Sequence, residues 1–517
     1  MFKSPPGGAG NPRESARRLA WPLFLAVAAF YLLGTGGTIN TPDGVLMFRV
    51  TRSLVEDRTW AIAPLAEAPG WGGLNVLDPA TGGSRFYAKY GPGLPLCAVP
   101  AYLAGGALAP LARAGEKDLF EDSAGKRRSW YDVSPSNFEE AFRAFAVSWT
   151  NSAVVAATVA GVFLIGLELG FGLLPSLLSG LVGAIATPLW PYSKTFFAEP
   201  LGGLGLTWFF YFILRGRGAG GQRWRHLAAG LCLGLCVLAK PPHLVLLLPA
   251  ALLVAGYARR LPGREGAGRV MAFAAGFLPV IALFAVRNHL CFGAWWETGY
   301  GDEIRQWTTP LWEGMAGLLV SPGRGLLLYF PIWILVAAAS RRFTSSHRLE
   351  SLFIAGCPAV LLVLHARWHS WEGGWCWGPR FLLPAIPLLL IPLASLFRDL
   401  PRSRAARLAV AGVVVLGFLV AFSGAWVDFN DFHEWLHGTF EAHRAAFQER
   451  GIATSTELYR WSWAYSPLAR TWTFPAKDYF LLPRAIREPG LILALFGVWT
   501  AVLLFQGFRL IRRVGGG

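Results

Sequence analysis

The sequence has few charged residues and no cysteine pattern typical of a metal site or a disulfide framework. Only 15% of its 517 residues are charged, whereas 54% are hydrophobic and the mean hydropathy is +0.42. The six cysteines include no CxxC pair, and most fall in or beside apolar segments. One soluble core cannot bury this much apolar surface. The composition therefore predicts a polytopic membrane protein.

Apolar windows long enough to cross a hydrocarbon core recur along the whole chain. We expect about twelve transmembrane helices, each of about twenty residues. The first follows three arginines and has no small-x-small cleavage site, so we interpret it as an uncleaved signal anchor. The windows lie near 19–38, 145–167, 173–191, 197–214, 226–240, 242–257, 269–288, 325–340, 349–366, 381–397, 406–426 and 489–509.

The distribution of basic residues predicts the orientation of the chain. The net charge of +16 comes from short clusters between apolar windows, which is the positive-inside pattern and does not suggest a nucleic-acid-binding surface. Segment 93–112 is apolar but broken by Pro95, Pro100 and Pro110, and counting it as a span would place every later basic cluster outside. We therefore expect it to lie in or dip into the outer interface. The outer face then collects residues 39–144, 192–199, the Lys240 turn, 289–323, 367–380 and 427–488.

Four motifs follow one another on the predicted outer face. They are TPDGVLMFRVTRSLVEDRTWAIAP (41–64), SRFYAKYGPGLPLCAVPAYLAGG (84–106), YSKTFFAEPLGGLGL (192–206) and CVLAKPPHLVLLLP (236–249). In this order they resemble segments of the GT-C membrane glycosyltransferases, particularly lipid A aminoarabinose transferases and protein O-mannosyltransferases. The family pattern is an acidic site before a helix, a lysine before a proline, a second acidic site before a proline, and a lysine at a helix end.

Three later segments resemble those of less characterised bacterial members of the same family. They are ETGYGDE (297–303), SPGRG (321–325) and HSWEGGWCWGPR (369–380). The chain departs from the family at one point, because many relatives have two adjacent acidic residues where it has Asp43 and Gly44. This departure leaves open whether two carboxylates act together in catalysis at that position.

The resemblance implies an all-α GT-C bundle in the bacterial cytoplasmic membrane with its active site facing outside. It implies inverting transfer of a sugar from a polyprenyl-phosphate donor to a hydroxyl of a lipid, glycan or protein acceptor. We expect a transmembrane module over 1–426 whose first outer loop, 39–144, holds interfacial helices. An outer region over 427–488 and a last transmembrane helix with a cytoplasmic tail over 489–517 would follow.

Such a transfer needs a base for the acceptor proton, and Asp43 is the candidate because it follows the first apolar window. The alternative is that Asp43 caps the next helix. Glu199 is the second catalytic candidate, which would assist Asp43 through a hydrogen bond or a shared divalent cation. Alternatively, Glu199 beside Pro200 only stabilises a helix N-terminus. No cofactor other than that cation is expected.

Cations are needed to hold the leaving phosphate. Lys89 and Lys240 are candidates because each lies at an outer boundary beside Pro or Gly, although snorkelling would explain both positions. Arg324 is a third candidate, in a turn whose amides suit anions, and the alternative is that this turn caps the next span.

Sugar or acceptor binding is assigned to aromatic and charged residues near these motifs. The Trp-rich loop, residues 368–380, places indole faces beside charged groups, and sugars stack on such faces. Its alternative explanation is the aromatic belt of a membrane interface. The candidates are Tyr90, Trp371, Glu372, Trp375 and Arg380.

Two other functions remain as alternatives. His433, Glu434 and His437 fit HExxH, the zinc-binding motif of metalloproteases. Phe440, however, stands where the longer motif needs Gly, and on a continuous helix His443 would point away from the other two histidines. A lipid or sugar transporter that uses the same outer cavity is the third function considered.

Overall fold

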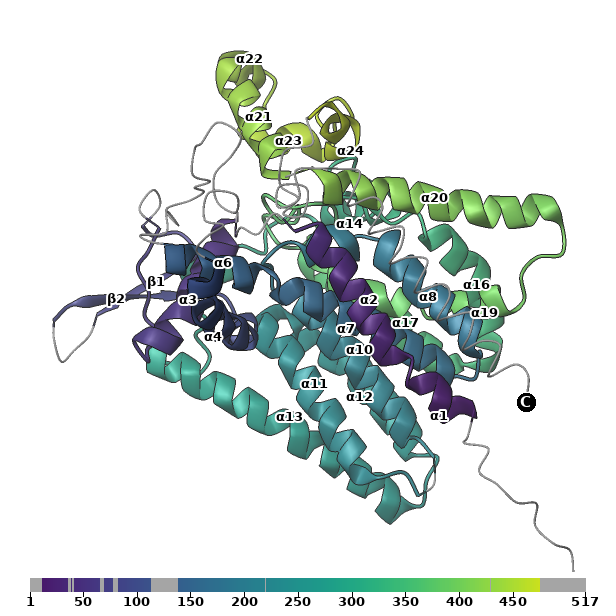
Figure 1. Cartoon of the computed structure of the whole chain (residues 1–517). Helices are drawn as coiled ribbons and strands as arrows, with labels where there is room; N and C mark the ends of the chain where they lie inside the picture. Colours follow the sequence, from purple (N-terminus) through teal and green to yellow (C-terminus); the bar gives the residue numbers. More distant parts are fainter. Residues whose placement is uncertain are drawn as a thin grey trace, which may run out of the picture.

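The structure is a computed structural model that describes residues 12–35, 39, 41–65, 69–77, 82–112, 138–218, 220–427 and 429–474. It is mainly α-helical, and Figure 1 shows α10, α11, α12 and α13 running side by side. The chain is a multi-pass membrane protein with several long apolar helices. The last helix expected at 489–509 lies outside the described residues.

The helices and strands follow in three groups along the chain. The first group is α1 (Pro12–Arg17), α2 (Ala20–Leu33), α3 (Pro42–Glu56), β1 (Gly73–Leu77), β2 (Ser84–Ala88), α4 (Gly93–Ala112), α6 (Phe138–Ser148), α7 (Thr150–Glu168), α8 (Leu173–Ile185) and α9 (Leu189–Ser193). The second is α10 (Glu199–Gly216), α11 (Arg223–Ala239), η2 (Pro241–Leu246), α12 (Leu247–Ala258), α13 (Gly263–Phe292), η3 (Gly301–Arg305), α14 (Leu311–Val320) and α15 (Leu326–Tyr329). The third is α16 (Trp333–Ser346), α17 (Arg348–Ala366), η4 (Arg380–Ala385), α18 (Ile386–Leu389), α19 (Leu393–Arg398), α20 (Arg404–Trp426), α21 (Phe429–Ala442), α22 (Arg444–Glu449), α23 (Ser455–Arg460), α24 (Pro467–Arg470) and η5 (Thr471–Thr473).

The expected count of about twelve transmembrane helices stays a prediction. Within the described residues, seven segments are long and apolar enough to cross a membrane. One of them is α4, which the sequence placed in the interface, and Pro100 and Pro110 lie inside it without breaking it. The seven are Gly93–Leu111, Phe138–Glu168, Pro241–Ala258, Gly263–Phe292, Arg348–Ala366, Arg380–Arg398 and Arg404–Trp426.

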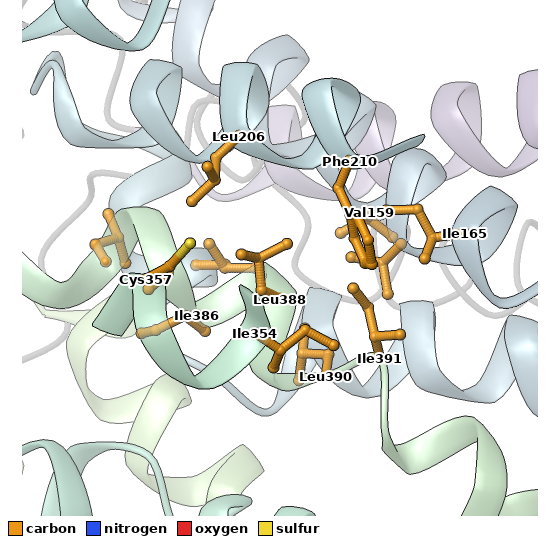
Figure 2. Packing of buried hydrophobic residues seen from close by; sticks show 14 of the residues in the cluster. Val159, Ile165, Leu206, Phe210, Ile354, Cys357, Ile386, Leu388, Leu390 and Ile391 are labelled. Carbon is orange, nitrogen blue, oxygen red and sulfur yellow. The ribbon is translucent and has the colours of Figure 1, made fainter. Parts of the chain in front are cut away.

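The core lies where α10 packs against α7 and α11, while α13 packs on the other side of α11. Small residues allow this close approach, as the sequence suggests for membrane helices. A Cβ at Gly230 would lie 2.1 Å from the carbonyl oxygen of Phe273, and one at Gly276 would lie 2.0 Å from that of Leu227. Figure 2 shows apolar side chains of α7, α10, α17 and α18 meeting in the interior.

A two-stranded hairpin is an addition to the expected all-α fold. β1 and β2 pair antiparallel, with Gly73 opposite Ala88. The strands approach closely because residue 73 has no side chain, since a Cβ there would lie 2.2 Å from the carbonyl oxygen of Tyr87. Lys89 follows β2 directly, and its amide donates to the carbonyl of Gly72 at 2.9 Å. The hairpin therefore fixes the backbone of one predicted site residue.

Several basic helix ends gather at one end of the bundle. Arg17 and Arg215 both pair with Glu168, at 2.6 and 3.3 Å, and Arg217 pairs with Glu350 at 3.5 Å. These pairs join α1, the end of α7, the end of α10 and the start of α17. The predicted grouping of basic clusters on one side is thus present among these helices, whereas the cytoplasmic location of that side stays a prediction.

Candidate functional site

Asp43 lies in the first turn of α3, and another residue caps that helix. The Thr41 side chain accepts a hydrogen bond from the amide of Gly44 at 3.1 Å, and Pro42 occupies the first turn. Thr at the cap and Pro just inside it are favoured at helix starts. The alternative in which Asp43 is the cap is therefore wrong, and its carboxylate is directed to other partners.

One guanidinium joins the two carboxylates that the sequence proposed as catalytic. Arg380, at the start of η4, donates from Nη2 to Asp43 Oδ2 at 2.5 Å and from Nε to Glu199 Oε1 at 2.8 Å. Its Cζ also lies 3.9 Å from the centre of the Phe197 ring. The predicted link between Asp43 and Glu199 therefore runs through an arginine.

Lys240 completes this group from the end of α11. Its Nζ donates to Glu199 Oε1 at 2.6 Å and lies 4.3 Å from the centre of the Phe381 ring. Phe381 also stacks on His365, with the ring centres 4.4 Å apart. Lys240 is thus directed inward to a carboxylate, so simple snorkelling toward the interface does not describe it.

The exposure of the two carboxylates distinguishes them. The Glu199 side chain is 0% exposed, whereas that of Asp43 is 14% exposed. Glu199 lies at the N-terminus of α10, where a helix dipole favours negative charge, and its Oε2 has no hydrogen-bond partner among the described residues. A substrate can therefore reach Asp43 more readily, while Glu199 holds Lys240 and Arg380 in place.

Tyr90 supplies the remaining contact to Asp43. Its hydroxyl donates to Oδ1 at 2.9 Å, so both carboxylate oxygens are oriented. Burial and the neighbouring Asp43 carboxylate raise the pKa of Tyr90 well above its usual value. The phenol consequently stays protonated and acts as a hydrogen-bond donor at neutral pH.

Lys89 lies beside this group in a separate ion pair. Its Nζ donates to both oxygens of Glu303, at 2.6 and 2.8 Å. The ammonium also lies 5.1 Å from the centre of the Tyr300 ring and 5.7 Å from that of Trp71. Lys89 is 11% exposed and Glu303 is 35% exposed. A cation flanked by aromatic rings thus lies at the rim of the site.

Arg324 is placed differently from the two lysines. It is fully buried, and it donates to the carbonyls of Glu372 and Gly374 at 2.8 and 2.7 Å and to the Tyr459 hydroxyl at 2.9 Å. The guanidinium therefore ties the SPGRG turn to the Trp-rich loop and to α23. Its predicted role in phosphate binding stays a prediction.

The Trp-rich loop also makes internal contacts. Trp371 is 1% exposed, and the Arg460 guanidinium lies over its ring at 5.6 Å. Arg460 donates to Glu372 at 3.0 Å, and Trp375 stacks on His433 at 5.3 Å. These three loop residues hold α21 and α23 against the loop. Among the five predicted sugar or acceptor residues, Tyr90 and Arg380 are the two that contact Asp43 in the described structure.

The HExxH segment lies on α21, where its two histidines have different surroundings. His433 is buried, and its Nε2 lies 3.5 Å from Nη2 of Arg324, so a cation would meet a positive charge there. Burial and Arg324 lower the pKa of His433 well below its usual value. His437 is exposed. Among the described residues, no group of three His, Cys, Asp or Glu side chains is arranged to hold a metal ion.

The position of Arg380 argues against the divalent cation that Asp43 and Glu199 were considered to share. Arg380 occupies the position between the two carboxylates, and a bridging cation would have to displace its guanidinium. The arginine already supplies positive charge to both groups. The residues present here therefore fit an arginine-bridged pair better than a metal centre.

Sequence reasoning did not identify Glu303, Tyr300 or His365 as part of this region. Glu303 and Tyr300 lie in the ETGYGDE motif, which indicated only a resemblance to the family and no role for individual residues. A charged residue next to glycines at an outer boundary is the signal that could have found Glu303. His365, at the end of α17, is an ionisable side chain in an apolar segment, which is itself a signal of function in a membrane protein.

No protein-family model and no curated protein sequence matches this chain. Among solved structures, it is similar to ArnT from Cupriavidus metallidurans in the apo state, with a TM-score of 0.48, 15% identity and coverage of 90% of this chain and 76% of that one. ArnT bound to undecaprenyl phosphate gives a TM-score of 0.49, 15% identity and coverage of 90% and 84%.

The oligosaccharyltransferase of Archaeoglobus fulgidus in the apo form gives a TM-score of 0.49 and 11% identity, covering 85% of this chain and 59% of that one. ArnT and this oligosaccharyltransferase are both GT-C membrane glycosyltransferases. At these scores and identities, the likeness assigns no activity to this chain.

Proposed function

We propose that this protein is an inverting membrane glycosyltransferase that moves a sugar from a polyprenyl-phosphate donor to an acceptor hydroxyl. The active site would lie at the outer face of a bacterial cytoplasmic membrane. The acceptor would be a lipid, a glycan or a protein. The order of the sequence motifs and the convergence of their charged residues support this proposal together.

The observation that carries the proposal is the arginine-bridged carboxylate pair. Four of the predicted residues come from α3, α10, α11 and η4, yet they form one connected group: Asp43, Glu199, Lys240 and Arg380. A more exposed carboxylate lies beside buried cations, which is what proton removal and phosphate departure together require. A simple interfacial belt would not bring these charges together.

In the proposed reaction, Asp43 accepts the proton of the acceptor hydroxyl as its oxygen bonds to the anomeric carbon. The bond from that carbon to the phosphate oxygen breaks, and polyprenyl phosphate leaves with the electron pair. Lys89, Lys240 and Arg380 would stabilise the departing charge. A single displacement inverts the anomeric centre.

The test is transfer of a labelled sugar from polyprenyl phosphate in vesicles containing the full chain. We expect Asp43→Asn to lower the rate by about 10² or more, because general-base catalysis contributes at least that factor. Asp57→Asn is the matched control, since Asp57 is exposed at the other end of the same helix. Unchanged transfer by Asp43→Asn would contradict the base assignment, and substrate crossing the membrane without covalent change would indicate a transporter.

A further inference from the structure

Among the described residues, each of the three cations Lys89, Lys240 and Arg380 is already in an ion pair. Three carboxylates, Asp43, Glu199 and Glu303, face three cations, Lys89, Lys240 and Arg380. A polyprenyl phosphate would add negative charge to a group whose charges already balance. A phosphate that pairs with Lys89, Lys240 or Arg380 must therefore displace the carboxylate that already contacts that cation.

Burial indicates which pair opens most easily. Lys240 and Arg380 both pair with Glu199, which is 0% exposed, and separating them would leave a charge without water. Glu303 is 35% exposed, so its carboxylate can be hydrated once it leaves Lys89. The Lys89–Glu303 pair thus costs least to open.

The backbone around Glu303 differs from that around the other two carboxylates. Asp43 and Glu199 lie in the first turns of helices of 15 and 18 residues, whereas Glu303 lies in η3, a turn of five residues. Gly299 and Gly301, four and two residues before Glu303, have positive φ values of 86° and 51°. A Cβ at Gly299 would lie 2.9 Å from the Cα of Lys89, so this segment rests directly on the lysine.

We propose that Glu303 is a counter-ion that occupies Lys89 in the donor-free state and that the donor phosphate displaces it. The inference rests on the proposed function, because it names what Lys89 binds during turnover. Glu303 then sets donor affinity without taking part in the chemical step. Tyr300 lies over the same ammonium, and its ring remains as a wall of the phosphate site after Glu303 leaves.

The test is direct binding of a short-chain polyprenyl phosphate to the full chain in detergent, measured by calorimetry. We expect Glu303→Gln to bind about fivefold more tightly, the effect of removing one partly exposed ion pair. Glu303→Ala should shift affinity in the same direction. The matched control is Asp302→Asn, because Asp302 is 95% exposed on the same turn and should leave the affinity unchanged.

A second comparison identifies the cation involved. In a Lys89→Gln background, Glu303→Gln should give no gain, because the freed ammonium is then missing. Equal or weaker binding by Glu303→Gln and Glu303→Ala in the wild-type background would overturn the proposal and make Glu303 a residue that positions Lys89. Each variant is checked for an unchanged thermal unfolding midpoint.

The outcomes separate this inference from the proposed function. If wild-type protein transfers no sugar but Glu303→Gln still binds polyprenyl phosphate more tightly, the function fails and the inference stands. If transfer occurs while Glu303→Gln gains no affinity, the inference fails and the function stands. If both hold, the KM for the donor should fall in Glu303→Gln while kcat stays unchanged.

Discussion

Each end of α10 has ion pairs between basic residues and a glutamate, but the two ends differ in how far these side chains are exposed to water. At the basic end, Arg217 is 33% exposed and pairs with Glu350 at 3.5 Å. At the other end, Glu199 is 0% exposed and receives two cations at 2.6 and 2.8 Å. Arg217 can exchange a lost partner for water, and Glu350, which is 8% exposed, keeps a hydrogen bond from the Tyr257 hydroxyl. At the site end, by contrast, Glu199 has no access to water. Geometry at the site end is therefore fixed by the protein alone.

The largest effect should come from Arg380→Gln. The substitution leaves Asp43 without its 2.5 Å partner and removes one of the two cations on Glu199, so we expect transfer to be lost. Breaking a buried pair should also lower stability by about 3–5 kcal/mol. Arg380→Lys should not restore transfer, because an ammonium cannot reproduce the two-pronged contact. Rates in vesicles and unfolding in detergent measure both effects, and substantial transfer by Arg380→Gln would contradict the bridge.

A smaller effect is expected from Tyr90→Phe. Loss of the 2.9 Å hydrogen bond to Asp43 should lower kcat about tenfold, because a bond to a charged group is worth about 1.5 kcal/mol. The control is Tyr87→Phe, since Tyr87 is the neighbouring tyrosine on β2. An unchanged kcat in Tyr90→Phe would mean that the hydroxyl does not orient Asp43.

The same tyrosine predicts a pH dependence of stability. Its pKa is raised in the folded protein, so above about pH 10 the unfolded chain loses this proton first and stability falls as pH rises. Below that pH, the two states bind the proton equally and Tyr90 adds no slope. Tyr90→Phe should therefore lose stability less steeply than wild type above about pH 10. Identical slopes would contradict the raised pKa.

The smallest effect should follow Arg217→Gln at the basic end. Arg217 is 33% exposed and the buried Glu350 keeps its hydrogen bond from the Tyr257 hydroxyl, so stability should change by about 1 kcal/mol and transfer should remain at the wild-type rate. Comparison with Arg380→Gln under the same conditions tests the difference between the two ends directly. A loss of transfer in Arg217→Gln would show that the ends are not independent.

The sequence predicts the long apolar helices of this fold. Long apolar windows identify helices such as α7 and α20, because hydrophobicity and length are local properties. The interfacial helix expected over 93–112 is present as α4 and continues through Pro100, while its place in the interface stays a prediction. The β1–β2 hairpin has strands of only five residues each, and their pairing depends on close backbone contact at Gly73.

The site was predictable where a charge lies at a helix end. Asp43, Glu199 and Lys240 each stand at such a boundary, so orientation by charge places them on one side. The pairing of Lys89 with Glu303 spans 214 residues, and no local pattern reports it. Arg324 and Trp375 are residue types common in binding loops. In the structure, however, Arg324 donates to the Glu372 carbonyl and Trp375 stacks on His433. Residue type alone does not distinguish recognition from packing.

The length of α10 connects the site to the bilayer itself. Glu199 begins this helix and Arg215 lies in its last turn, and its 18 residues span about 27 Å. The hydrocarbon core of a typical bilayer is about 30 Å thick. α10 is not itself among the seven segments long and apolar enough to cross a membrane, but it packs against one of them, which contains α7, so its two charged ends lie about one hydrocarbon thickness apart beside that segment. Membrane thickness then becomes a structural parameter of the site, since lipid chain length sets how far these charges stand from water.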